Sequence, residues 1–165
     1  PATCSTTLPQ RHNYAALQSL SKPADLRRKL MTRSGAMALT ITPIYAGIIG
    51  LLFILLSTRV IVYRRANRIS LGDAGDKNLL KRMRAQANCA EYAPMGLLLL
   101  ALAELAGAPG VAVHTAGITL LAGRVMHAYG FASTPQKMGL RVGGMMLTLI
   151  MIALTALGLI GHGLL

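Results

Sequence analysis

The sequence predicts an all-α integral membrane protein built as an antiparallel bundle of four helices. Hydrophobic residues make up 53% of the 165 residues and charged residues only 13%, whereas about a quarter of an average soluble domain is charged. The hydrophobic residues gather in long runs, as membrane-spanning helices require. Short links between such runs favour an antiparallel bundle, in which helices satisfy every backbone polar group inside lipid.

The charge balance is strongly basic, with 17 Lys and Arg against five Asp and Glu and a net charge of +12. In a soluble protein this excess would suggest a nucleic-acid partner. An excess of basic residues in loops is equally typical of membrane proteins. Five Tyr, two Phe and no Trp leave few aromatic side chains to stack on bases, so we expect no nucleic-acid partner. Cys4 and Cys89 lie in different settings and predict neither a disulfide framework nor a metal site.

Residues 1–36 form a polar segment that we expect to be disordered or weakly helical. No small-residue cleavage site follows the first apolar run, so a secretory signal is not indicated. Met31 and Met37 both precede that run. We therefore interpret residues 1–36 as an extension that is absent from the working protein, and residues 37–165 as the membrane domain. The basic residues of the extension are Arg11, Lys22, Arg27, Arg28, Lys29 and Arg33.

Four apolar segments divide the membrane domain. The first ends in a basic cluster, and a polar link, ISLGDAGDKN, leads into the second. The short links AGAPG and STPQK turn the chain into the third and the fourth. The predicted helices cover about 39–63, 79–105, 111–131 and 140–162, and the basic cluster consists of Arg64, Arg65 and Arg68.

Basic residues also predict the orientation. The stretch from Arg64 to Arg84, both included, contains seven Lys or Arg, and Lys137 and Arg141 flank the link between the third and fourth helices. The link between the second and third has none. Because basic loops stay on the cytoplasmic side, we expect the first and third links to be cytoplasmic, at the inner membrane if the protein is bacterial.

Polar residues of the second and third helices reach into the membrane. The second helix is continuously apolar only over residues 93–103, about 17 Å at 1.5 Å per residue and roughly half of a hydrocarbon core. The polar residues that precede this apolar stretch on the same helix must therefore enter the membrane. By the same count Glu91, Arg124 and His127 lie about 20–24 Å from the outer turn.

One face of the second helix carries most of these polar residues. At 100° per residue, four polar residues of this helix lie within an arc of about 100°, while Gln86 points elsewhere. Pro94 can kink the helix just beyond them. Ionisable residues inside a membrane normally face a bundle interior, an interface or a wet cavity, so we expect a polar pocket opening to the cytoplasm. Alternatively, Arg84, Glu91 and Arg124 form buried ion pairs that only fix helix packing. The polar stripe consists of Arg84, Asn88, Glu91 and Tyr92.

The stretch RAQANCAEY at residues 84–92 resembles the R-x-x-x-N-x-x-E-Y motif of the MAPEG family, the membrane-associated proteins in eicosanoid and glutathione metabolism. The similarity extends from about residue 39 to the C-terminus and includes YRRANRIS, GRVMHAYGF and GLR. It implies a homotrimer of four-helix subunits that binds glutathione between neighbours, near the cytoplasmic face.

The resemblance also implies roles for individual residues. The polar stripe would hold the glutathione backbone, supported by Gln86 and Arg64, and Arg124 and His127 would complete the binding set. Arginines suit the two carboxylates of glutathione, and the carboxylate of Glu91 suits its ammonium group. Where the family often has tyrosines on the third helix, this chain has His127, Tyr129 and Phe131.

Arg141 aligns with the arginine that is thought to stabilise the glutathione thiolate in the leukotriene-synthesising members of the family. A nearby cation lowers a thiol pKa from about 8.5, and a shift of ~2 units needs about 2.7 kcal/mol. The thiolate can then attack a hydrophobic electrophile that arrives from the lipid. Placing Arg141 at this position requires a few extra residues in the preceding link.

The sequence thus predicts a glutathione-dependent transferase or peroxidase with Arg141 as its catalytic residue. A non-catalytic lipid-binding or scaffold member of the same family is the alternative. A small transporter or channel subunit is a third hypothesis, but it predicts charges along the full depth of the membrane rather than in one half.

Overall fold

The computed structural model describes residues 38–165, and the interpretation of residues 1–36 lies outside that part of the chain. The described residues confirm the all-α class. The helix limits differ from the predicted ones by at most three residues, and α4 continues as one helix through Pro94. The helices are α3 (Thr42–Ala66), α4 (Lys77–Leu105), α5 (Gly110–Ala132) and α6 (Met138–Leu164).

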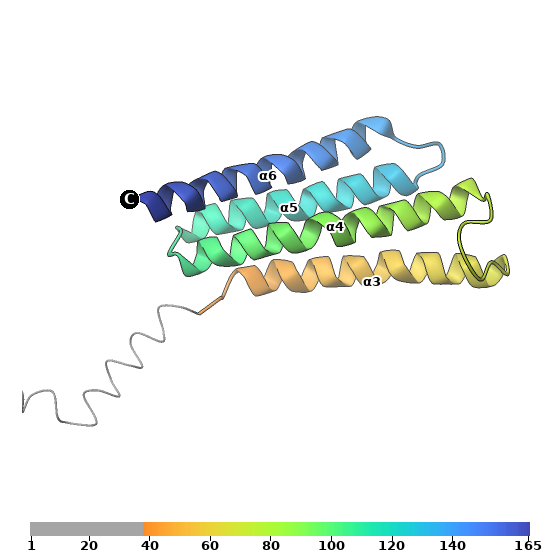
Figure 1. Cartoon of the computed structure of the whole chain (residues 1–165), viewed down its shortest axis with the longest axis horizontal. Coiled ribbons are helices and arrows are strands. Elements are labelled where there is room, and N and C mark those ends of the chain that lie inside the picture. The colour runs from red at the N-terminus through yellow and green to blue at the C-terminus, as the bar shows by residue number, and fades with distance from the viewer. Residues whose placement is uncertain (1–37) are drawn as a thin grey trace, which may run out of the picture. The chain divides into compact units, whose positions relative to one another are not determined.

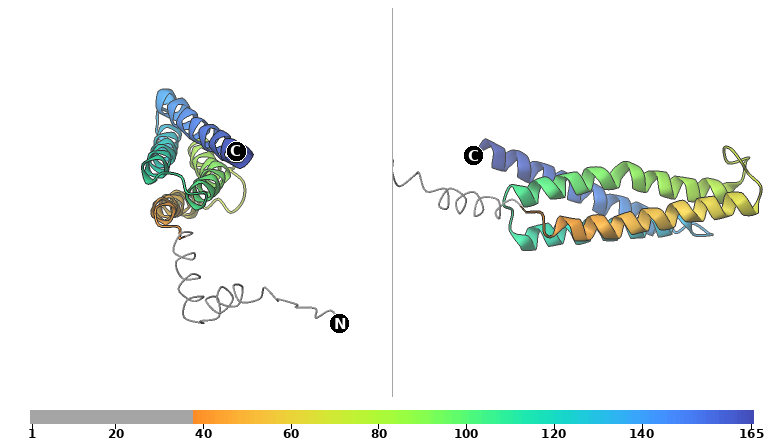
Figure 2. Two further views of the ribbon diagram at one scale, coloured as in Figure 1. Left: turned by 90° about the vertical axis from the view of Figure 1, so that its left-hand side faces the viewer. Right: turned by 90° about the horizontal axis from the view of Figure 1, so that it is seen from below.

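The four helices lie side by side, and the chain turns back at each link (Figure 1). Helix α4 contacts all three other helices, and α5 and α6 share the most extensive contact. Seen end-on, α3 and α6 lie on opposite sides of the bundle (Figure 2). The two basic links, at residues 67–76 and 133–137, occur at the same end of the bundle, so they bring the basic residues of distant segments together.

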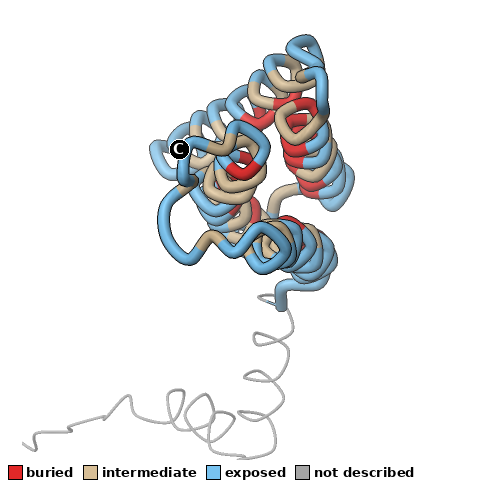
Figure 3. The backbone as a smooth tube through the Cα atoms, turned by 90° about the vertical axis from the view of Figure 1, so that its right-hand side faces the viewer, coloured by how far each residue is buried: buried red, intermediate tan, exposed pale blue. Residues whose placement is uncertain are grey.

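Buried residues lie on the inward faces of the helices, and exposed residues cover the outside (Figure 3). Much of that outside is apolar: Leu51 is 68% exposed, Ile54 60%, Leu154 66% and Leu157 65%. Helices α3 and α6 are long and apolar enough to cross a membrane. Soluble monomers rarely expose contiguous apolar surface on this scale, so the outer surface indicates contact with lipid or with other subunits.

Helix α4 begins at Lys77 because Asp76 caps it. The Asp76 carboxylate accepts hydrogen bonds from the backbone amides of Asn78 at 2.7 Å and Leu79 at 3.1 Å, and from the Tyr63 hydroxyl at 2.9 Å. The bond from the Leu79 amide, followed by the one from Tyr63, holds the pKa of Asp76 below its usual value. This cap joins the end of α3 to the start of α4.

The Asp76 cap predicts a loss of stability in acid. Because the folded pKa is depressed, its contribution is complete above the unfolded pKa of about 4 and is lost as the pH falls through the folded value. Melting temperatures measured from pH 6 to pH 3 should fall more steeply for the wild type than for Asp76→Asn, which cannot titrate. Asp73→Asn, in the same link, is the control and should follow the wild type.

Helix α3 begins without a capping side chain of its own, and Glu104 from the end of α4 supplies the cap. One carboxylate oxygen accepts from the backbone amides of Thr40 and Ile41, both at 2.7 Å, and from the Thr40 hydroxyl at 3.0 Å. The other accepts from the amide of Thr42 at 2.7 Å. The carboxylate therefore binds the amides of Ile41 and Thr42, which the helix start leaves without partners, and the amide of Thr40 just before them.

Replacing Glu104 with alanine should destabilise the fold by about 1–2 kcal/mol, as expected for the loss of a helix cap. Glu104→Gln, which keeps one acceptor oxygen, should lie between alanine and wild type. Leu105→Ala, at the neighbouring exposed position, is the matched control. Thermal melting in detergent measures the difference, and a Glu104→Ala protein that melts with the wild type would contradict the capping role.

Helices α5 and α6 meet backbone to backbone. A Cβ atom at Gly144 would lie 2.6 Å from the carbonyl oxygen of Gly123, and one at Gly130 would lie 2.6 Å from the amide nitrogen of Arg141. Only glycine permits such an approach. We call this contact, of Gly123 with Gly144 and of Gly130 with the backbone at Arg141, the α5–α6 seam. It brings the polar residues of α5 against the first turns of α6.

Candidate functional site

The polar stripe of α4 lies at the edge of the bundle rather than inside it. Asn88 and Tyr92 are half-buried beside α5, whereas Arg84 and Glu91 are exposed. At 100° per residue, Arg84 and Glu91 lie further round the helix from its buried face than Asn88 and Tyr92 do. The buried face consists of Ala85, Cys89, Ala93, Gly96 and Leu100.

Arg124 is the largest fully buried side chain in the described part of the chain, with 1% exposure. Its Nε and Nη2 atoms donate to the Thr148 hydroxyl of α6 at 2.9 and 2.7 Å, and its Nη1 atom donates to the side-chain oxygen of Asn88 at 2.9 Å. Its guanidinium carbon also lies 5.5 Å from the centre of the Tyr92 ring. Three helices therefore converge on one cation.

This arrangement differs from the alternative of buried ion pairs among Arg84, Glu91 and Arg124. The partners of Arg124 are neutral oxygen atoms, and Glu91 points out of the bundle on the exposed side of α4. The sequence analysis did not identify Thr148, because a threonine in an apolar run resembles a residue that only packs in the core. Its spacing of seven residues from Arg141, which places both on one face of α6, was the available signal.

Arg141 and His127 meet across the α5–α6 seam. The Nδ1 atom of buried His127 lies 2.9 Å from the carbonyl oxygen of Arg141. The guanidinium carbon of Arg141 lies 4.1 Å from the centre of the Phe131 ring. The two residues therefore lie at the same level of the bundle.

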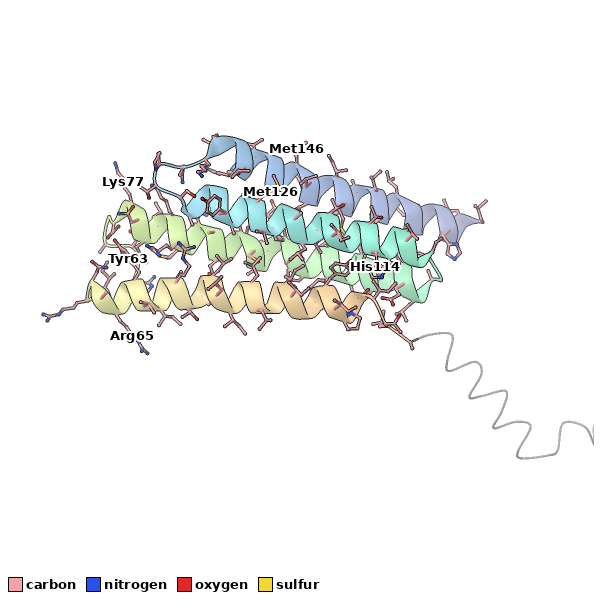
Figure 4. All side chains as sticks on the ribbon, turned by 180° about the vertical axis from the view of Figure 1, so that it is seen from behind. Tyr63, Arg65, Lys77, His114, Met126 and Met146 are labelled. Carbon is pink, nitrogen blue, oxygen red and sulfur yellow. The ribbon has the colours of Figure 1, made fainter. Side chains whose placement is uncertain are left out.

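Arg64 lies at the same end of the bundle, at the end of α3. Its Nη2 atom donates to the sulfur of Met83 at 3.2 Å, and the side chain lines an open cleft of about 420 Å³ together with Arg65 and Arg68. Tyr63, Arg65 and Lys77 mark this basic end in Figure 4, where His114 lies toward the other end. Gln86 is half-buried on α4.

One cavity of the described chain lies away from the polar stripe. It measures about 650 Å³, is lined mainly by apolar groups, and lies between the end of α4, the start of α5 and the end of α6. Its members include Leu100, Ala112, Met151 and Leu154. The expected polar pocket is therefore not enclosed within a single chain, because Arg84 and Glu91 lie outside the four-helix core.

The sequence model of the MAPEG family matches residues 42–161, which include all four described helices almost completely. The chain belongs to the MAPEG family.

This MAPEG chain is similar in sequence to two named proteins. The inner membrane protein YecN of Escherichia coli strain K12 is 38% identical over 91 residues, which cover 55% of this chain and 70% of YecN. Leukotriene C4 synthase of Bos taurus is 34% identical over 108 residues, covering 64% of this chain and 71% of that protein. Membership in the family and the apolar helices α3 and α6 together support a membrane location.

Arginine side chains gather toward the basic end of this MAPEG chain. Arg64, Arg84, Arg124 and Arg141 come from all four helices, and Glu91 is the one acidic residue of α4 near them. Arginine donates pairs of parallel hydrogen bonds to carboxylates. A ligand that carries both carboxylates and an ammonium group would match this set of donors and acceptors.

Proposed function

We propose that this protein is a glutathione-dependent membrane enzyme, a transferase or peroxidase that acts on hydrophobic electrophiles. The observation that carries the proposal is the buried cation of Arg124, which only neutral groups contact within the described chain. Burying a charge without an opposite charge is costly. A ligand anion at this site would supply the missing negative charge.

Glutathione fits the available groups. Its two carboxylates are suited to arginines such as Arg84 and Arg64, and its ammonium group is suited to the exposed carboxylate of Glu91. Asn88 and Tyr92 offer polar groups beside them, Gln86 supports them from the same helix, and His127 extends the site toward Arg141. Membership in the MAPEG family and the similarity to leukotriene C4 synthase support the same choice.

The open position of Arg84 and Glu91 favours a site that a neighbouring subunit completes. In our proposal the protein is a homotrimer of antiparallel four-helix subunits, and glutathione binds between neighbours. The basic links at residues 67–76 and 133–137 would face the cytoplasm, because an excess of Lys and Arg keeps loops on that side. An electrophile dissolved in the bilayer would reach the thiolate from the side.

The experiment that tests this function is a titration with glutathione followed by melting temperature. A ligand that binds only the folded protein stabilises it by about 1.4 kcal/mol at ten times its Kd. We expect the wild type to show this rise and Glu91→Ala to need about tenfold more glutathione, since a charge-assisted hydrogen bond contributes about 1.5–3 kcal/mol. Lys77→Ala, at the exposed start of α4, is the control variant and should titrate as the wild type does.

Absence of any shift in the wild type would overturn glutathione binding and favour the lipid-binding or scaffold alternative. An equal shift in Glu91→Ala would mean that glutathione binds, but that the polar stripe is not its binding site. Turnover with a chlorinated aromatic acceptor then separates an enzyme from a protein that only binds glutathione.

A further inference from the structure

Two side chains of α5 hold Arg141 from different directions. The ring of Phe131 lies under the guanidinium group, with 4.1 Å between the guanidinium carbon and the ring centre. His127 contacts the backbone of the same residue, with 2.9 Å between its Nδ1 atom and the Arg141 carbonyl oxygen. Because His127 and Phe131 are four residues apart on one helix, they share one face of α5, and their ring centres are 5.8 Å apart.

The α5–α6 seam makes both contacts possible. Gly130, between the two rings in sequence, lies so close to α6 that a Cβ atom there would meet the amide nitrogen of Arg141 at 2.6 Å. On α6, a Cβ atom at Gly144 would likewise clash with the backbone of Gly123. The first turn of α6 is therefore pressed against α5 at the level of Arg141.

The contact at His127 determines its tautomer. A carbonyl oxygen can only accept a hydrogen bond, so Nδ1 carries the proton and donates it. The other ring nitrogen, Nε2, is buried and makes no hydrogen bond within the described chain. The one polar contact of this buried ring is thus with Arg141, which indicates a role that acts through Arg141.

The contact at Phe131 leaves the guanidinium group available. A ring face attracts the cation but accepts none of its N–H groups in a conventional hydrogen bond. Within residues 38–165, the side chain of Arg141 makes this cation–π contact and no hydrogen bond. Its N–H donors and its positive charge therefore remain for an anion.

We propose that Phe131 and His127 are positioning residues for Arg141: Phe131 orients the guanidinium group without neutralising it, and His127 fixes the backbone that carries it. This rests on the proposed function, in which Arg141 stabilises the glutathione thiolate.

The test uses the purified full chain in detergent, with glutathione and a chlorinated aromatic acceptor. Phe131→Leu and His127→Leu remove the ring face and the donor, and Phe131→Tyr and His127→Asn retain them. We expect Phe131→Leu to keep the glutathione-induced rise in melting temperature, and both leucine variants to lose about tenfold in kcat and to need a higher pH for half-maximal rate. The conservative variants should restore the wild-type pH profile.

Matched controls are Phe53→Leu, at the other of the two phenylalanines, and His162→Leu, at the exposed end of α6. Both should retain wild-type kcat and pH profile. Adding Phe131→Leu to Arg141→Ala should cause no further loss, since residues that act through one group are not additive. This double variant also keeps the test valid if His127→Leu does not fold.

The outcomes separate the two proposals. A wild type that neither binds nor turns over glutathione overturns the proposed function and the positioning roles together. An active wild type whose Phe131→Leu variant retains full kcat and an unchanged pH profile overturns the positioning roles alone. A full further loss in the Phe131→Leu/Arg141→Ala protein does the same, because Phe131 would then act independently of Arg141.

Discussion

Replacing Arg141 with alanine is expected to lower the turnover of glutathione with a chlorinated aromatic acceptor about 25-fold at pH 7 and up to about 100-fold at lower pH. A cation that lowers the thiol pKa by ~2 units supplies about 2.7 kcal/mol, which corresponds to a 100-fold larger thiolate fraction below the shifted pKa. The half-buried position of Arg141 and its contact with an uncharged ring leave that charge largely unscreened. Initial rates at saturating glutathione measure the effect.

The pH profile distinguishes this mechanism from a general loss of structure. The rate of Arg141→Ala should continue to rise toward the pKa of the free thiol, about 8.5, whereas the wild-type rate should level off at lower pH. Arg141→Lys, which keeps the charge but not the planar group, should lie between them. Arg59→Ala, at an exposed arginine of α3, is the control. An equal loss of rate at every pH would contradict the role of Arg141 in stabilising the thiolate.

Replacing Gly144 with alanine should destabilise the bundle by about 3 kcal/mol, the upper part of the range for overpacked cores. The added methyl group would lie 2.6 Å from the carbonyl oxygen of Gly123 and still closer to the amide nitrogen of His127. Both are backbone atoms, so no side-chain rotation relieves the clash and the two helices must separate. Thermal melting in detergent measures the loss.

Gly158→Ala is the matched control, because it lies on the same helix and a Cβ atom there would meet nothing within 4 Å. That change should be neutral or should stabilise the fold by up to about 1 kcal/mol, through the higher helix propensity of alanine. Equal melting temperatures for the two alanine variants would contradict the close contact at the α5–α6 seam.

The sequence was sufficient to predict the helices, because long apolar runs separated by polar links define them. It predicted the helix ends less well, since the side chains that cap a helix can lie far from it in the sequence. Glu104, which caps the start of α3, lies 62 residues beyond Thr42 in the chain. Asp76 caps α4 locally, but its partner Tyr63 belongs to the preceding helix. No pattern within either helix reveals these contacts.

The site was predicted in part. The motif in α4 identified Asn88 and Tyr92, and depth along α5 identified Arg124, which the structure brings into contact with both. Thr148 and Phe131 were not among the predicted site residues, because a threonine and a phenylalanine in apolar helices resemble packing. Helical periodicity alone also could not predict that Arg84 and Glu91 lie outside the four-helix core, since that depends on where α5 and α6 pack.

The cap at Glu104 also sets the height of α3 along its neighbour. Sliding α3 by one helical turn, about 5.4 Å, would break all four hydrogen bonds to the carboxylate at once. Arg64 lies 22 residues beyond Thr42 on the same rigid rod, about 33 Å away. The carboxylate at one end of the bundle thus acts as a stop that determines the height of Arg64 beside Met83 at the opposite end.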